Sequence, residues 1–442
     1  MLKLINTDFF KNASLLFSGS LLAQIIGFGA LYFLGRIYAP EDFGEVETIM
    51  KLAGVFIAIG GLRYEMAIVV EEKTSQAEEL LRLSLFLNFG ISTLIFCIIL
   101  FFKNTIGIFF KLNDPNLLFG LPVIVWITSS TESIILWYNR VKKFKKISVN
   151  RVLFSSSGTL YKLLHPFTLV SGNGLFIGQI LAQFLALLHM VYKLPVQLLK
   201  TTHQNLKAVL KTYRSFAVFS SPAAILNILA TSMPVFVISA FDGQEATGYF
   251  GNAYKLTYLP MSMLSLAIGQ VFFERIARIR NQKENASKMA HQLVNTLFLI
   301  GIIPVIVMLV CGDQIAPLIL GDQWEETGVF IQIMILFYFT MFLTSSFSSA
   351  FETYQKLKFQ LGYNLIFLIC TFGALYLGYR EGGNTRAALT WFSLVGIVLR
   401  LSILNYFFVL FGKNLIAKTI FAILITGVLS YLGFTLKNVM IP

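Results

Sequence analysis

The residues of this sequence that could do chemistry are charged side chains inside long apolar segments. Five are basic (Lys51, Arg63, Lys162, Lys255 and Arg400) and four are acidic (Glu45, Glu47, Glu65 and Glu132). A charge at the centre of a bilayer costs at least ~2.5–3.5 kcal/mol on insertion scales, so each needs a partner or a water-filled cavity. The deepest of these charges are basic, which favours a site for an anionic substrate.

Local spacing offers a structural explanation for some of these charges. Glu47 and Lys51 are spaced i, i+4 and could pair along one helix face. Arg63 could extend its guanidinium to the membrane surface. Glu132 could carry a proton or act only as a salt-bridge partner. The structural and the functional interpretation therefore both stay open for these residues.

Two positions favour a cavity more strongly. Lys162 and His165 are spaced i, i+3 and Pro166 follows, which places a polar pair beside a helix break. Arg400 has no acidic residue near it in the sequence. We therefore predict a substrate-binding set and a set for proton or ion coupling. The first is Lys51, Arg63, Lys162, Lys255 and Arg400; the second is Glu47, Glu132 and His165.

The chain lacks the short motifs that mark common catalytic and metal sites. It contains no GxxxxGK[ST] loop, nucleophile elbow, HExxH or EF-hand pattern. Its four histidines and three cysteines do not have the spacing of metal ligands. We therefore predict no catalytic residue, no bound metal and no cofactor, which makes an enzyme less probable than a transporter.

Composition indicates a membrane protein. Of 442 residues, 56% are hydrophobic and 13% are charged, against roughly 25% charged in soluble domains. The net charge of +13 does not indicate nucleic-acid binding, because most basic residues lie in short loops between apolar segments. The expected fold class is an all-α polytopic membrane protein whose surroundings are membrane lipids.

Apolar windows of about 20 residues predict the transmembrane helices. Twelve core spans are expected, at 12–34, 44–70, 80–102, 117–139, 151–171, 174–192, 215–240, 246–273, 291–311, 327–350, 359–378 and 386–410. A further C-terminal span is expected at 415–436.

The basic residues between these spans predict the orientation. With the N-terminus in the cytoplasm, the cytoplasmic segments hold 24 Lys and Arg, while the opposite loops hold five, or six with Lys437. Positive charge accumulates on the cytoplasmic side of membrane proteins. We therefore expect a multi-pass protein of the bacterial inner membrane with a cytoplasmic N-terminus.

A weak internal repeat predicts two similar halves. Glu41-x-x-Gly44 is followed by Lys51, and Glu245-x-x-Gly248 is followed by Lys255 at the same spacing, 204 residues later. Each half contains an even number of spans, so both halves enter the membrane from the same side and form parallel repeats. We expect two six-helix lobes around a central cavity, with Lys162 and Arg400 lining it. The expected parts are a lobe at 1–192, a basic cytoplasmic linker at 193–214, a lobe at 215–410 and a C-terminal segment at 411–442.

Two short stretches carry a resemblance to a known family. Residues 36–44, RIYAPEDFG, resemble a turn of bacterial polysaccharide flippases, and residues 63–68, RYEMAI, resemble the signature that closes their second span. The chain thus resembles the oligosaccharide flippase (Wzx-like) family of the multidrug/oligosaccharidyl-lipid/polysaccharide (MOP) exporter superfamily. The span at 415–436 departs from the twelve or fourteen spans usual in that superfamily.

The resemblance implies a function and a set of partners. It implies a flippase that translocates undecaprenyl-pyrophosphate-linked oligosaccharide repeat units to the periplasmic leaflet by alternating access, for O-antigen, capsule or exopolysaccharide. A proton or sodium gradient would drive it, and a polysaccharide polymerase and a chain-length regulator would be partners. The alternatives are a lipid II flippase, a multidrug cation antiporter of the same superfamily, and, less favoured, a membrane-embedded glycosyltransferase or polymerase.

Overall fold

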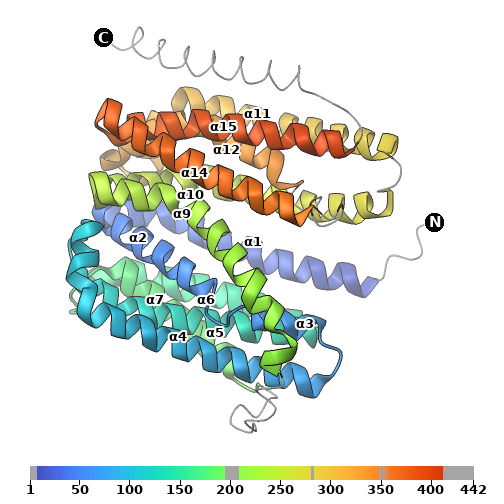
Figure 1. The fold of residues 1–442 in the computed structure, drawn as a ribbon. Coiled ribbons are helices and arrows are strands. Elements are labelled where there is room, and N and C mark those ends of the chain that lie inside the picture. The colour runs from blue at the N-terminus through green and yellow to red at the C-terminus, as the bar shows by residue number, and fades with distance from the viewer. Residues whose placement is uncertain are drawn as a thin grey trace. The chain divides into compact units, whose positions relative to one another are not determined.

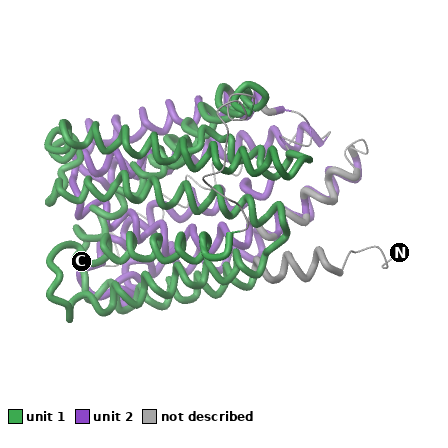
Figure 2. Tube along the Cα trace, turned by 90° about the horizontal axis from the view of Figure 1, so that it is seen from below, with its two compact units in different colours: residues 1–232 green, residues 233–442 purple. Residues whose placement is uncertain are grey.

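The computed structural model describes residues 7–194, 209–279, 283–347, 351, 354 and 356–411. These residues form helices joined by short turns and contain no strand (Figure 1). The chain divides into two compact units, Met1–Ser232 and Met233–Pro442 (Figure 2). Among the described residues, nine helices are long and apolar enough to cross a membrane. The predicted all-α, multi-pass class is therefore confirmed.

The first unit is built around a buried central helix. Its helices are α1 (Thr7–Ile37), α2 (Pro40–Ile57), α3 (Ala67–Val70), α4 (Thr74–Phe109), α5 (Gly120–Arg140), α6 (Phe144–Leu164) and α7 (Gly174–Val191), with α9 (Ser221–Asp242) running across the boundary into the second unit. Single turns of helix lie at η1 (Tyr64–Met66), η2 (Pro115–Phe119), η3 (His165–Phe167) and η4 (Phe216–Ser220). Helix α5 contacts α2, α4 and α7, while α6 packs against α1 and α7. The side chains of α5 are therefore the ones best shielded from lipid.

The second unit has the same kind of plan. It contains α10 (Gln244–Ile279), α11 (Lys283–Leu320), α12 (Glu325–Ser345), α14 (Leu357–Gly382), α15 (Thr385–Leu410) and the turn η5 (Asp322–Trp324). The central helix is α12, which contacts α10, α11 and α15. Helices α14 and α15, orange and red in Figure 1, run side by side. The core is rich in phenylalanine, including Phe342, Phe347 and Phe407, so the unit is held largely by aromatic packing.

The repeated segment begins a helix in each unit. Helix α2 starts at Pro40 and α10 at Gln244, one residue before Glu41 and Glu245. Proline suits the first turn because its missing N–H would have no intrahelical partner there. The Asp42 side chain also accepts a hydrogen bond from Ala39 N at 3.1 Å. Lys51 and Lys255 therefore occupy corresponding positions on α2 and α10.

The predicted continuous helix at 44–70 is wrong. Helix α2 ends at Ile57, and the chain passes through turns before η1 and α3. Gly60 and Gly61 lie in this break, and Leu62 and Arg63 follow with positive φ values of 48° and 62°. Hydropathy averaged over a window does not detect two adjacent glycines, which favour departure from a helix.

The predicted span at 151–171 is displaced. Helix α6 runs from Phe144 to Leu164, and residues 168–173 form an irregular segment that leads into α7. Pro166 lies inside the short turn η3 and cannot continue the α-helical hydrogen bonding. Lys162 is therefore in the last turn of α6 and not at mid-helix. The structure places the other ten core spans on helices as far as it describes them, while 348–350, 415–436 and most of the predicted linker, 195–208, lie outside the described residues.

Close approach of α14 and α15 depends on a glycine. A Cβ at Gly378 would lie 2.5 Å from Ala388 Cα and 2.8 Å from Ala387 O, both backbone atoms, whereas a Cβ at Gly373 on the same helix would meet nothing within 4 Å. We predict that Gly378→Ala destabilises the protein by about 1–3 kcal/mol through overpacking. Gly373→Ala, the matched control, should be neutral or stabilising by about 0.5–1 kcal/mol because alanine favours a helix. Thermal unfolding of the purified variants in detergent measures both effects; equal midpoints would contradict the predicted contact.

Candidate functional site

Lys51 forms the local pair that its spacing allows. Its Nζ lies 3.5 Å from Glu47 Oε1 on the same face of α2. Both side chains are partly buried, so the pair reduces the cost of placing each charge in an apolar layer. Lys255, at the corresponding position of α10, is half-buried.

Lys162 and His165 lie at one end of the first unit. Lys162 Nζ donates a hydrogen bond to Gln179 Oε1 on α7 at 3.2 Å, and Tyr38 Oη donates to Lys162 O at 2.7 Å. Burial raises the pKa of Tyr38 to about 12, so its hydroxyl stays protonated as a donor at neutral pH. His165 is buried at the end of α6. Lys162 and His165 thus belong to a packed polar group at the junction of α1, α6 and α7.

Arg63 gathers with two acids at the break in the second span. It interacts electrostatically with Glu65, which follows it in η1, and with Glu132 on α5. The Nε of Arg63 and the Oε2 of Glu65 are buried without a hydrogen-bond partner among the described residues. Among the predicted coupling residues, Glu132 therefore meets ionisable groups from another element.

Arg400 lies in the middle of α15 and is surrounded by aromatic side chains. Its guanidinium carbon lies 4.8 Å from the centre of the Phe367 ring on α14. It interacts electrostatically with Tyr258 on α10 and Tyr363 on α14, and Tyr363 Oη donates to Leu399 O at 3.2 Å. The Nε of Arg400 is buried, and no described residue accepts a hydrogen bond from it.

The rings around Arg400 extend into a tyrosine cluster. The ring centroids of Tyr258 and Tyr254 are 5.2 Å apart, and those of Tyr258 and Tyr338 are 5.7 Å apart. Tyrosine offers an apolar face and a hydroxyl in one side chain. The second unit therefore combines a partly buried arginine with aromatic surfaces and hydroxyl groups.

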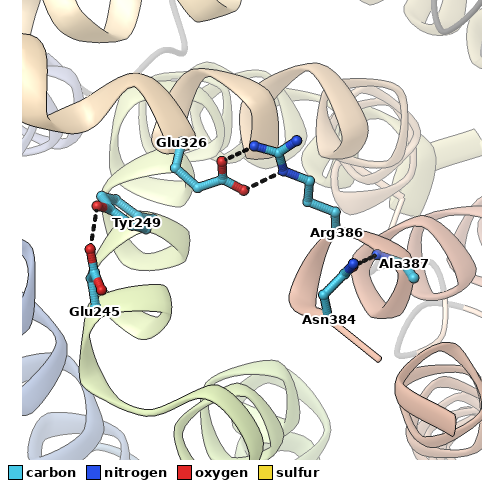
Figure 3. A network of polar contacts seen from close by, with 6 residues as sticks. All are labelled: Glu245, Tyr249, Glu326, Asn384, Arg386 and Ala387. Atoms are coloured by element: carbon cyan, nitrogen blue, oxygen red, sulfur yellow. Dashed lines mark hydrogen bonds and ion pairs between the residues drawn. The ribbon is translucent and has the colours of Figure 1, made fainter. Parts of the chain in front are cut away.

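A second arginine of α15 provides a contrast. Near the start of that helix, Arg386 Nε lies 2.7 Å from Glu326 Oε1 on α12, and Nη2 contacts Oε2 of the same carboxylate (Figure 3). The figure also shows the Glu245–Tyr249 pair and the Asn384 cap at this end of the unit. Arg386 is thus neutralised by an ordinary ion pair, whereas Arg400 has aromatic neighbours and no carboxylate partner among the described residues.

Sequence reasoning missed the polar residues that accompany these charges. Tyr258 and Tyr363 left no signal, because aromatic residues are frequent throughout the apolar segments. Asn88 on α4 and Ser129 on α5 could have been found, since Asn88 is a lone amide within a predicted span. Six consecutive polar residues, 128–133, also interrupt the predicted span that contains Glu132.

A protein-family model matches most of the chain. The family model described as "Polysaccharide biosynthesis protein" matches residues 33–328. The lipopolysaccharide biosynthesis protein WzxC of Escherichia coli (strain K12) is 22% identical over 205 residues, 46% of this chain and 41% of WzxC. The succinoglycan biosynthesis transport protein ExoT of Rhizobium meliloti (strain 1021) is 20% identical over 434 residues, 92% of this chain and 83% of ExoT. The chain thus spans less than half of WzxC but most of ExoT.

Solved structures show the same fold. The lipid II flippase MurJ, in an inward closed conformation, matches with a TM-score of 0.68 at 15% identity, over 96% of this chain and 98% of MurJ. An inward-facing multidrug resistance MATE family transporter of the MOP superfamily matches with a TM-score of 0.65 at 16% identity, over 90% and 94% of the two chains. These similarities confirm the predicted two-lobe helical class. The chain therefore belongs to the polysaccharide biosynthesis protein family, and its fold is similar to that of a transporter of the MOP superfamily.

Proposed function

We propose that this protein is a flippase for undecaprenyl-pyrophosphate-linked oligosaccharide repeat units. It moves the sugar from the cytoplasmic to the periplasmic leaflet by alternating access, and the product serves the assembly of a surface polysaccharide. Membership of the polysaccharide biosynthesis family and similarity to ExoT, named as a transport protein, support a transport function. ExoT and the two structural neighbours are named as transporters or a flippase, which agrees with a protein that is not an enzyme.

The surroundings of Arg400 are the main support for the proposed class of substrate. A guanidinium whose Nε is buried, and which has no carboxylate partner among the described residues, can form two parallel hydrogen bonds with a phosphate group. In a low-dielectric site this attraction is stronger than in water. Tyr258 and Tyr363 beside it offer ring faces and hydroxyls suited to a sugar. The arrangement thus fits a ligand that joins a pyrophosphate to an oligosaccharide.

The alternatives differ in the charge or in the destination of the substrate. The shared fold does not separate them, because one fold hosts several functions. A multidrug cation antiporter is disfavoured because the charge of Arg400 repels a cationic substrate. A lipid II flippase would carry a related anionic lipid, so the glycan delivered to the cell surface distinguishes it from the proposed function.

The remaining parts of the proposal concern placement and partners. We place the protein in the bacterial inner membrane with a cytoplasmic N-terminus, and assign 1–192 and 215–410 as lobes joined by the linker 193–214. A proton or sodium gradient drives the cycle, and no further cofactor is needed. A polysaccharide polymerase and a chain-length regulator receive the product. Lys51, Arg63, Lys162 and Lys255 assist Arg400 in binding the substrate.

Loss of the Arg400 charge should impair transport. In a strain that lacks its own flippase, we predict that Arg400→Gln lowers surface polysaccharide about 10–100-fold, the effect of losing a charged hydrogen bond of ~1.5–3 kcal/mol. Arg400→Lys should be intermediate because lysine keeps the charge without the planar pair of donors. Arg386→Gln, on the same helix, is the matched control and should support normal amounts. The measurement is glycan per cell, normalised to the amount of protein in the membrane.

Two outcomes of that experiment would contradict the proposal. Wild-type glycan with Arg400→Gln would remove Arg400 from substrate binding. Rescue of a strain depleted of its lipid II flippase, without restored surface polysaccharide, would favour the lipid II alternative.

The lysines at the repeated positions provide an independent test. We predict that Lys51→Ala and Lys255→Ala each lower surface polysaccharide without lowering the amount of protein in the membrane. If Lys51 serves only to neutralise Glu47, the double variant Glu47→Gln/Lys51→Ala should recover function. If Lys51 contacts substrate, the double variant should remain as defective as Lys51→Ala. Unchanged polysaccharide in both single variants would exclude the lysines from the mechanism.

A further inference from the structure

A groove lies between α1 and α6 of the first unit. Its volume is about 520 Å³, which is within the range of ordinary ligand sites. The residues that line it include Leu22 of α1 and Ser148, Val149, Val152, Leu153 and Ser156 of α6. We call this feature the α1–α6 groove.

Small residues bring the two helices together beside the groove. A Cβ at Gly19 would lie 2.9 Å from Ser148 Cβ and 3.0 Å from Ser148 Cα. Ser155 Oγ donates a hydrogen bond to Ala23 O at 2.5 Å. The larger lining residues are not buried by this contact, since Leu22 is 48% exposed and Val149 is 46% exposed. The α1–α6 groove therefore presents apolar surface that a ligand can cover.

Lys145 lies on the same face of α6 as the groove. It precedes Val149, Val152 and Ser156 by four, seven and eleven residues, which is the periodicity of one helix face. From Ser148 to Ser156 the wall of the groove is about 12 Å long, at 1.5 Å per residue. Half of the hydrocarbon core of a bilayer is about 15 Å. The groove thus has nearly the depth of one leaflet, and Lys145 lies about one turn beyond its end.

Three exposed lysines gather at this end of α6. They are Lys142, Lys143 and Lys145, and none of their ammonium groups has a carboxylate partner among the described residues. Lys146 differs, because its Nζ donates to Met190 O at 3.2 Å. The three exposed lysines are therefore available to an external anion.

The neighbouring helices supply no negative charge for these lysines. The sequence contains no Asp or Glu between Glu132 and Asp242, so α6 and α7 have none. Residues 18–37 of α1 also contain none. The end of the α1–α6 groove therefore complements a negatively charged group.

We propose that the α1–α6 groove binds one anionic phospholipid. Its phosphate contacts Lys142, Lys143 and Lys145, and one acyl chain lies along the apolar wall. Basic clusters at the ends of membrane helices attract anionic head groups. A neutral phospholipid would gain only the apolar contact, and free phosphate would gain only the charge. The proposal concerns the first unit alone and does not rest on the proposed transport function.

Binding can be measured on the purified full-length protein in detergent. The probe is phosphatidylglycerol, and phosphatidylcholine with the same acyl chains is the neutral comparison. A ligand that binds only the folded state raises the thermal midpoint of unfolding, so titration of each lipid gives its affinity. We expect phosphatidylglycerol to bind at least tenfold more tightly. A photoreactive group on its acyl chain should label residues 18–22 and 148–156.

Lysine variants test the binding of the head group. Lys145→Gln should weaken phosphatidylglycerol binding about fivefold, and the triple variant of Lys142, Lys143 and Lys145 about 100-fold, because each basic residue near an anionic head group contributes about a factor of five. These side chains are exposed, so the variants should fold. Lys73→Gln is the matched control, because Lys73 is also exposed and does not line the groove; it should bind as the wild type does.

A larger side chain tests the binding of the acyl chain. Val149→Trp fills part of the groove and keeps all three lysines, so it should weaken binding about tenfold and abolish labelling of 148–156. Val123→Trp is the matched control, because Val123 is 41% exposed on α5 and outside the groove. It should leave both the affinity and the labelling unchanged.

Four results would overturn the proposal. The first is equal affinity of the wild type for the two phospholipids, and the second is unchanged affinity in the triple lysine variant. The third is labelling that avoids both 18–22 and 148–156. The fourth is displacement of phosphatidylglycerol by a polyprenyl phosphate at equal concentration, which would assign the groove to a polyprenyl lipid instead.

Discussion

A charge or a free backbone polar group inside hydrocarbon needs a partner within the protein, and this constraint governs how the chain is built. Glu47 and Lys51 satisfy it as an ion pair on one helix. The broken second span satisfies it through its neighbours: Arg140 of α5 donates to Ile68 O at 3.1 Å and to Glu72 O at 2.9 Å. Arg140 thereby supplies donors for carbonyl groups where the broken span ends.

The two units contain a similar helix-starting segment but differ in the charged residues that they gather. Helices α2 and α10 start at corresponding residues and carry lysine at the same position. Where the first unit has Gly60 and Gly61, α10 continues through Leu264 and Ser265 without a break. The first unit consequently gathers two acids and one arginine, while the second holds an arginine among tyrosines.

The sequence was sufficient to predict most of the fold, because hydropathy and loop charge follow from the bilayer itself. It also pointed to Arg400 as a charge without a local partner. It failed at the second span, since two glycines do not lower the average hydropathy of a long window. The sequence could not reveal the partners of Arg400, because Tyr258 lies on a different helix, far away in sequence. Asn88 was overlooked because an amide carries no charge, although a buried amide also needs hydrogen-bond partners.

The most direct measurement of the central claim is translocation by the purified protein in liposomes. A polyprenyl-pyrophosphate-linked oligosaccharide is placed in one leaflet, and its sugar is then probed with a glycosidase that cannot cross the membrane. We expect the sugar to become accessible on the other side in liposomes that contain the wild type, and much more slowly in liposomes that contain Arg400→Gln. Equal rates with the wild-type protein and in protein-free liposomes would contradict it.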